Sequence, residues 1–356
     1  MIPVGLVLFF LIILFCLYPT YTDIIACIKL INSKIPYEST DYTGDKQKLF
    51  HNRPSVYWSK KSYFRPFLVV NGGAESREAL SKCVTKSDDM FLIHRQYHGP
   101  VKFGQLVIPV LPESILTNSK SDLRRELRNN LNQVDNNKLL HEILLLYEQE
   151  KEEAEGVHLL IAMICISIWI DLEDNELLEL SRKTVDCFNY FYDSIISNAK
   201  DWLSTPCTRE QKRVLTTMVD MVSNVKTKFR LDMSVNSMIN IINAGHDAIY
   251  SAYLHVLKTD YKSSSIRSIL KEHPNILAAG RHTLEPLKLC NHTVPGNVDI
   301  IIYLKGVSAF SYGGKSCIAK ASFAIELLDF LVQNQTKFFV SEKDLYMFEK
   351  LLLFIK

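Results

Sequence analysis

A long helix predicted over residues 235–257 constrains the fold more than any other feature of the sequence. Its sequence, VNSMINIINAGHDAIYSAYLHVL, is largely apolar and would extend for roughly 35 Å, enough to cross a whole domain. Gly245, His246 and Asp247 interrupt the apolar pattern at its centre, where a glycine costs about 1 kcal/mol relative to alanine. A close helix crossing would explain Gly245, and a solvated helix face would explain His246 and Asp247. These residues alone therefore define no site.

Helical spacing also extends over the region before this helix, from about Leu123 onward. The segment HLLIAMICISIWIDL is apolar all round but only about four turns long, which predicts a core helix and not a membrane span. Residues 23–120 contain aromatic and proline-bearing pieces, RPSVYWSKKSYFRPFLVV and FGQLVIPVLPESIL, typical of short strands and loops. The sequence therefore predicts a mainly α-helical fold with small β-sheets, in which residues 23–356 form one domain.

Charge and cysteine content exclude several classes of protein. The 356 residues include 41 basic and 39 acidic side chains, so there is no basic excess of the kind that binds nucleic acid. The eight cysteines are scattered without a CxxC pair, which predicts buried free thiols in a reducing compartment and not a disulfide framework.

Residues 1–22 carry no charged side chain and predict a single transmembrane anchor. A cleaved signal peptide is the alternative, but a basic n-region and a small-residue cleavage site are not clear. Because lysines follow this segment and do not precede it, the positive-inside rule predicts a membrane protein whose body faces the cytosol, at the endoplasmic reticulum if the source is eukaryotic. The sequons at Asn291 and Asn334 provide a test of this topology.

The segment AFSYGGKSCIAKASFAIELLDFL, which begins at Ala309, allows two interpretations. A Walker phosphate loop requires glycine five positions before Gly314, where this chain has Ala309, and the remaining chain is too short for the later strands of such a domain. Alternatively, the loop presents Cys317 to a metal, since its glycines let N–H groups approach the sulfur and the following helix start favours thiolate. A buried structural cysteine remains the other possibility for Cys317.

The pattern Phe310-x-x-Gly313-x-Lys315-x-Cys317-x-Ala319 resembles the cysteine loop of the cytochromes P-450, FxxGx[R/K]xCx[G/A]. This resemblance implies a P-450-like haem-thiolate fold in reduced form, with Cys317 as the iron ligand of haem b. It also implies that Phe310, Gly313 and Lys315 line the cofactor. A thiolate ligand favours O–O cleavage by haem iron.

The centre of the long helix is similar to the distal helix of the same family, [A/G]Gx[D/E]T. Ala244, Gly245 and Asp247 match this motif, and Ala248 stands where threonine is usual. The resemblance implies that Ala244 lies against the cofactor and that Asp247 and Ala248 occupy catalytic positions.

Three arginines stand where the family binds the haem propionates. The segment DLRRELRNNL is similar to the family's W/HxxxR segment, with Arg124 and Arg128 at the two key positions, and Arg281 follows the later ExxR helix. Arginine suits a carboxylate because its planar fork can bind both oxygens. A solvated helix face is the alternative for Arg124 and Arg128.

The chain departs from the family pattern at the ExxRxxP helix, where SILKEHPNI has Ser268 for glutamate and Lys271 for arginine. A register with Ser264 and Arg267 restores the arginine but misplaces the proline. In the family, the glutamate and arginine of this helix lock to a residue in an irregular stretch just before the cysteine loop. That stretch is also missing here, so all three partners of the lock are altered together.

The resemblance implies a monooxygenase that hydroxylates a small lipophilic substrate with electrons from a flavoprotein reductase. Two alternatives remain open: a reductase-independent enzyme that rearranges hydroperoxides, and a non-catalytic haem-binding or partner-binding membrane protein.

Overall fold

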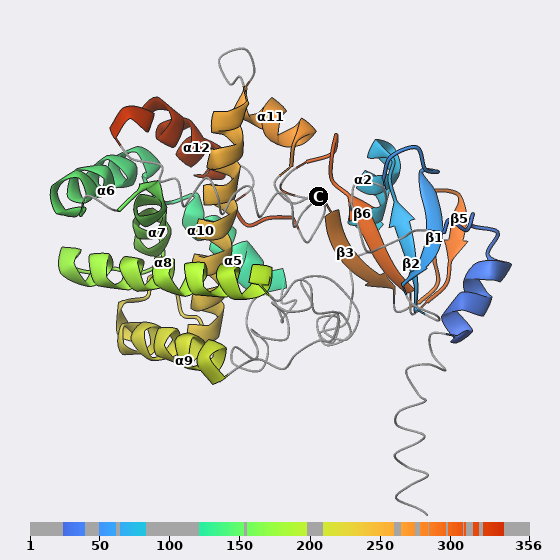
Figure 1. Cartoon of the computed structure of the whole chain (residues 1–356), viewed down its shortest axis with the longest axis horizontal. Helices are drawn as coiled ribbons and strands as arrows, with labels where there is room; N and C mark the ends of the chain where they lie inside the picture. Colours follow the sequence, from blue (N-terminus) through green and yellow to red (C-terminus); the bar gives the residue numbers. More distant parts are fainter. Residues whose placement is uncertain are drawn as a thin grey trace, which may run out of the picture. The chain divides into compact units, whose positions relative to one another are not determined.

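The computed structural model describes residues 24–39, 50–61, 65–82, 121–152, 155–197, 209–259, 265–274, 278–283, 285–296, 298–308, 310, 316–319 and 323–337 (Figure 1). Contacts divide the chain into two compact units. The first, here called the sheet unit, comprises Met1–Lys86, Ile276–Lys315 and Lys356, and the second, the helical unit, comprises Ser87–Asn275 and Ser316–Ile355.

The sheet unit contains a four-stranded sheet in the order β1-β2-β6-β3, in which β2 and β6 are parallel and the other neighbours antiparallel. A separate hairpin pairs β4 with β5. The strands predicted in RPSVYWSKKSYFRPFLVV are confirmed, whereas FGQLVIPVLPESIL lies outside the described residues. The strand bounds are β1 (Val56–Lys61), β2 (Arg65–Val70), β3 (Ala278–Thr283), β4 (Leu287–Leu289), β5 (His292–Val294) and β6 (Val298–Tyr303).

Alternating side chains give the four-stranded sheet two apolar faces. One face packs with a helix over residues 24–32 and with α2 (Gly73–Lys82). The opposite face holds an aromatic cluster in which the rings of Phe50 and Tyr303 stack with centroids 4.0 Å apart. Both helices lie in a region that the sequence predicted as strands and loops, so that prediction was incomplete. Short helices covering a sheet carry weak periodic signals, because tertiary packing supplies most of their stability.

The helical unit confirms the long helix and the core helix. α10 (Val235–Lys258) begins where the Ser234 hydroxyl accepts a hydrogen bond from the Ser237 N–H at 3.2 Å, and it contacts α7, α8, α9, α11 and α12. Every residue of α7 (Val157–Ser167) is buried. The other helices are α5 (Ser121–Leu131), α6 (Asn136–Glu150), α8 (Asp174–Ser197), α9 (Arg209–Asn224), α11 (Ile266–Glu272) and α12 (Phe323–Gln333).

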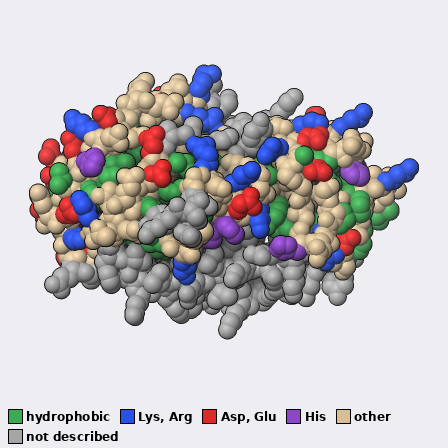
Figure 2. Space-filling model, turned by 90° about the horizontal axis from the view of Figure 1, so that it is seen from above, with side chains coloured by type: hydrophobic (Ala, Val, Ile, Leu, Met, Phe, Trp, Pro, Cys, Tyr) green, Lys and Arg blue, Asp and Glu red, His purple; other side chains and the backbone are tan. Residues whose placement is uncertain are grey.

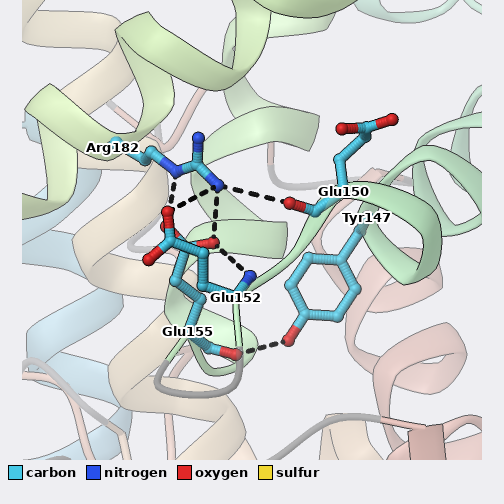
Figure 3. A network of polar contacts seen from close by, with 5 residues as sticks. All are labelled: Tyr147, Glu150, Glu152, Glu155 and Arg182. Atoms are coloured by element: carbon cyan, nitrogen blue, oxygen red, sulfur yellow. Dashed lines mark hydrogen bonds and ion pairs between the residues drawn. The ribbon is translucent and has the colours of Figure 1, made fainter.

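A polar network joins the α6–α7 connection to α8 (Figure 3). Arg182 donates to both carboxylate oxygens of Glu155, at 2.5 and 2.9 Å, and to the Glu150 carbonyl at 3.3 Å. The Tyr147 hydroxyl donates to the Glu155 carbonyl at 3.0 Å. Burial alone would raise the pKa of Glu155, but the hydrogen bond and charge of Arg182 lower it overall. The bidentate pair thus fixes α8 against the start of α7.

The described residues are mainly helical with two small sheets, as predicted. No helix among them is both long and apolar enough to cross a membrane, and the predicted anchor, residues 1–22, lies outside them. Figure 2 shows basic and acidic side chains interspersed on the visible face, in line with the nearly equal numbers of the two in the sequence.

Candidate functional site

Cys317 lies in an irregular segment, Ser316–Ala319, before α12. Its side chain is exposed and forms no disulfide, whereas the preceding Ser316 is buried. The Ala324 N–H, in the first turn of α12, reaches back to the Ala319 carbonyl at 3.4 Å. The alternative of a buried structural cysteine is therefore excluded. Residues 320–322, between this segment and α12, lie outside the described residues, so the effect of the helix start on Cys317 stays a prediction.

Arg128 connects α5 to this segment. Its guanidinium donates to the Ser316 carbonyl at 2.9 Å and to the Ser316 hydroxyl at 3.1 Å. These bonds hold the backbone of the residue next to Cys317, and they show that Arg128 does not lie on a fully solvated helix face. No pattern in the sequence predicted a contact between Arg128 and Ser316.

Other described cysteines are poorer candidates for a thiolate ligand. Burial raises the pKa of the Cys165 thiol to about 12 and that of Cys187 to about 11. Burial, with the charge of Glu78 as a further cause, raises the pKa of Cys290 to about 12. Because the thiolate is the form that ligates metals, these three thiols are unsuited to that role, whereas Cys317 is exposed.

The remaining predicted cofactor residues are divided between the two units. Gly313 and Lys315 lie outside the described residues. Phe310 and Arg281 belong to the sheet unit and are therefore described separately from Cys317. Phe310 is half-buried and its N–H donates to the Ser308 hydroxyl at 3.2 Å, while Arg281 is buried in β3, opposite Ile300 of β6.

In the centre of α10, the side chains of Ala244 and Asp247 lie outside the described residues, as does that of Arg124 in α5. Ala248 is half-buried. A side chain at Gly245 would lie 3.6 Å from the Cys165 sulfur, which is an ordinary contact, so no close helix crossing requires a glycine here.

The expectation that His246 lies on a solvated face is wrong, because His246 is fully buried. Its ring stacks on that of His158 from α7, with centroids 4.4 Å apart and planes inclined by 4°. His158 also stacks with Tyr250, at 4.1 Å. We call these three residues the imidazole stack. Helical spacing could identify the core helices, but it could not show that His158 and His246 meet.

The altered ExxR region forms the predicted helix, α11, with no buried polar lock on the described side chains. Ser268, Lys271 and Arg267 are exposed, and the Ser265 hydroxyl caps the helix by accepting from the Ser268 N–H at 3.2 Å. Ser264 of the alternative register lies outside the described residues.

The ligand available at Cys317, a single thiol, fits a metal ion that is already held by a chelating cofactor. Within the described ranges, no three histidine, cysteine or acidic side chains gather to hold a metal ion. A single exposed thiol can supply one ligand, and a thiolate is one of the ligands that hold haem iron. Cys317 would then ligate the iron, and Arg128 would fix the neighbouring backbone.

Comparison with solved structures shows that the chain has the fold of the cytochromes P-450. Cytochrome P-450EX alpha with myristic acid has a TM-score of 0.60 and 9% identity, over 84% of this chain and 90% of that chain. A variant of cytochrome P-450 OleT in complex with arachidonic acid has a TM-score of 0.58 and 11% identity, over 84% and 90%. CYP175A1 from Thermus thermophilus has a TM-score of 0.53 and 11% identity, over 84% and 91%. No family model and no curated protein matches the sequence.

Proposed function

We propose that the chain is a haem-thiolate monooxygenase that hydroxylates a small lipophilic substrate with dioxygen and electrons from a flavoprotein reductase. The observation that carries this proposal is the exposed thiol of Cys317, which forms no disulfide, in a chain with the cytochrome P-450 fold. Haem ligated by a thiolate supplies the capacity to cleave an O–O bond. Two of the similar structures hold long-chain fatty acids, which supports a lipophilic substrate.

The residues of the chain have separate roles in this proposal. Cys317 would ligate the iron as thiolate, and Arg128 holds the backbone at Ser316 through two hydrogen bonds. Arg281, which is buried, would pair with a haem propionate, as the resemblance implies. Asp247 in α10 would relay protons to the reaction site.

The spectrum of the reduced full-length protein with carbon monoxide tests this function. The wild type should show a thiolate-type Soret band, and Cys317→Ser should abolish it because a hydroxyl is a poor iron ligand. Cys27→Ser and Cys290→Ser, which change half-buried cysteines, serve as controls and should keep the band. A thiolate-type band in Cys317→Ser, or a wild type that binds no haem, would contradict the proposal.

A hydroperoxide-rearranging enzyme is the second candidate, and Ala248 is the observation that favours it. The resemblance implies that a threonine here helps deliver protons at the cofactor, and alanine has no donor or acceptor for that purpose. A positioned proton donor contributes typically ~10²-fold or more to a rate. Turnover driven by a reductase should therefore be poorly coupled in the wild type.

Ala248→Thr separates these candidates. For a monooxygenase, the ratio of hydroxylated product to reduced cofactor consumed should rise by about tenfold, since a hydroxyl donor is restored. For a hydroperoxide enzyme, wild type and variant should convert hydroperoxides equally well without a reductase. Absence of both activities in haem-loaded wild type and variant would favour the non-catalytic alternative.

A further inference from the structure

A helix over residues 24–32 lies in the sheet unit (Figure 1, dark blue). It has apolar side chains on two opposite faces. On one face Ala26 and Leu30 are buried in the core of the unit. On the other, Ile24, Ile28 and Ile31 are 36%, 53% and 65% exposed. Residues three and four positions apart lie on one side of an α-helix, so these three form a continuous surface, here called the isoleucine stripe.

The isoleucine stripe differs from other exposed apolar positions in the described part of the chain. Leu145 of α6 is 57% exposed, but its neighbours at helical spacing, His141, Glu142, Glu148 and Gln149, are exposed polar residues. A single exposed leucine in such a setting is ordinary, whereas a row of exposed isoleucines on a short helix calls for a partner. Tyr37, 45% exposed, follows the helix and adds an amphipathic side chain of the type found at membrane surfaces.

The adjoining sequence indicates lipid as that partner. Ile24 follows Thr22, the last of 22 residues without a charged side chain, with only Asp23 between them. Two residues span at most about 7 Å, so a bilayer that received the apolar segment would lie within reach of the stripe. Lys29 adjoins the stripe on the same helix, and Lys34 follows it; both are exposed and complement anionic headgroups.

We propose that the isoleucine stripe lies in the interface of a phospholipid bilayer, with the helix over residues 24–32 parallel to the membrane plane. Its buried face would remain in the core of the sheet unit, and Lys29 and Lys34 would lie at anionic headgroups. An apolar helix face can bury itself at the boundary between headgroups and acyl chains in this orientation. Lipid contact by the stripe is independent of haem binding, so failure of one would not imply failure of the other.

Site-specific photocrosslinking of the full-length protein tests this contact. The protein is reconstituted in vesicles of four parts phosphatidylcholine to one part phosphatidylserine, with p-benzoylphenylalanine replacing either Ile28 or Ile31. The same replacement of Leu145 is the matched control, because Leu145 is an exposed apolar residue on a helix of the other unit. Peptide mass spectrometry should find phospholipid adducts at positions 28 and 31 and only background at 145. Ile28→Asp should abolish the adduct at position 31, since a buried carboxylate is disfavoured.

Each other outcome identifies a different partner and overturns the proposal. A crosslink to residues 1–22 of the same chain would mean that this segment covers the stripe. A crosslinked dimer would mean that a second copy does so. Equal adduct yields at positions 28, 31 and 145, or none at 28 and 31, would mean that the stripe faces water.

Discussion

Arg128 contacts the residue adjacent to the candidate iron ligand. The family resemblance implies a haem propionate as its partner, which stays a prediction. In the structure, its guanidinium donates to the carbonyl and hydroxyl of Ser316. Because Ser316 is buried, removing the arginine would leave two acceptors without these donors. A hydrogen bond involving a charged group contributes about 1.5–3 kcal/mol, so Arg128 should matter even before haem binds.

We therefore predict that Arg128→Ala lowers the free energy of unfolding of the haem-free protein by about 2 kcal/mol. Urea denaturation measures this change, and Arg125→Ala, at an exposed position of the same helix, is the control. Arg128→Lys should recover part of the loss, since lysine keeps the charge but not the planar fork. If Arg128→Ala weakens only haem retention and leaves the haem-free protein unchanged, the arginine serves a propionate and not Ser316.

For single residues, the sequence predicted which side chains belong to the candidate site better than it predicted the contacts that they make. The spacing around Cys317 indicated a loop before a helix, and in the structure its thiol is exposed and forms no disulfide. The contact of Arg128 with Ser316 could not be predicted, because it joins segments 188 residues apart through the tertiary fold. The burial of His246 was also missed, since its partner His158 lies on another helix.

Among the helices, α7 and α10 are joined by the imidazole stack. Burial, with the nearby His158 as a smaller cause, lowers the pKa of His246 well below its ordinary value. The unfolded chain has the ordinary pKa of about 6.5, so below that pH it binds a proton that the folded protein does not. Stability should therefore be fully present above the unfolded pKa and fall as the pH drops below it, by up to about 1.4 kcal/mol per pH unit.

His246→Phe should flatten this pH dependence between about pH 6.5 and pH 5 while keeping an aromatic ring in the stack. Urea unfolding of the wild type and the variant over that range measures the slope, and His141→Gln, at an exposed position of α6, is the control. A residual slope of the same sign is expected from His255, whose pKa burial also lowers. An unchanged slope in His246→Phe would show that the stack does not couple folding to protonation.

Element prediction from the sequence succeeded where an apolar pattern persisted over many turns. The helix expected over residues 235–257 is α10, and the apolar segment expected to form a core helix is α7. The helix over residues 24–32 was missed because apolar residues on both its faces remove the amphipathic period. α2 was missed because few of its residues are apolar.

At the scale of the whole molecule, the residues predicted for the site belong to two different units, which no local pattern indicated. Arg281 and Phe310 belong to the sheet unit, while Cys317, Arg128 and α10 belong to the helical unit. The sequence predicted one domain over residues 23–356 and did not predict a division into two units. Pairing of β2 with β6 shows why: it brings together segments separated by the entire helical region, and such pairing depends on chain topology.

The orientation of the whole molecule toward a membrane can be tested at Asn291. This residue is exposed, and with Cys290 it forms the turn between β4 and β5, where both have positive φ (64° and 51°), as in a type I′ turn. Its sequon, Asn-His-Thr, is thus accessible on the folded body. Asn334 is the poorer reporter, because it is half-buried and donates to the Phe330 carbonyl at 2.9 Å.

We predict that Asn291 carries no glycan when the full chain is expressed in a eukaryotic cell, because Lys29 and Lys34 after the apolar segment favour a cytosolic body. The measurement is the mobility of the protein before and after glycosidase treatment. As a control, three lysines placed before the apolar segment, combined with Lys29→Gln and Lys34→Gln, should invert the orientation and yield a glycosidase-sensitive shift that Asn291→Gln reduces or removes. Such a shift in the unaltered chain would contradict the prediction and place the body in the lumen. The exposed β4–β5 turn does not itself prevent glycosylation of Asn291.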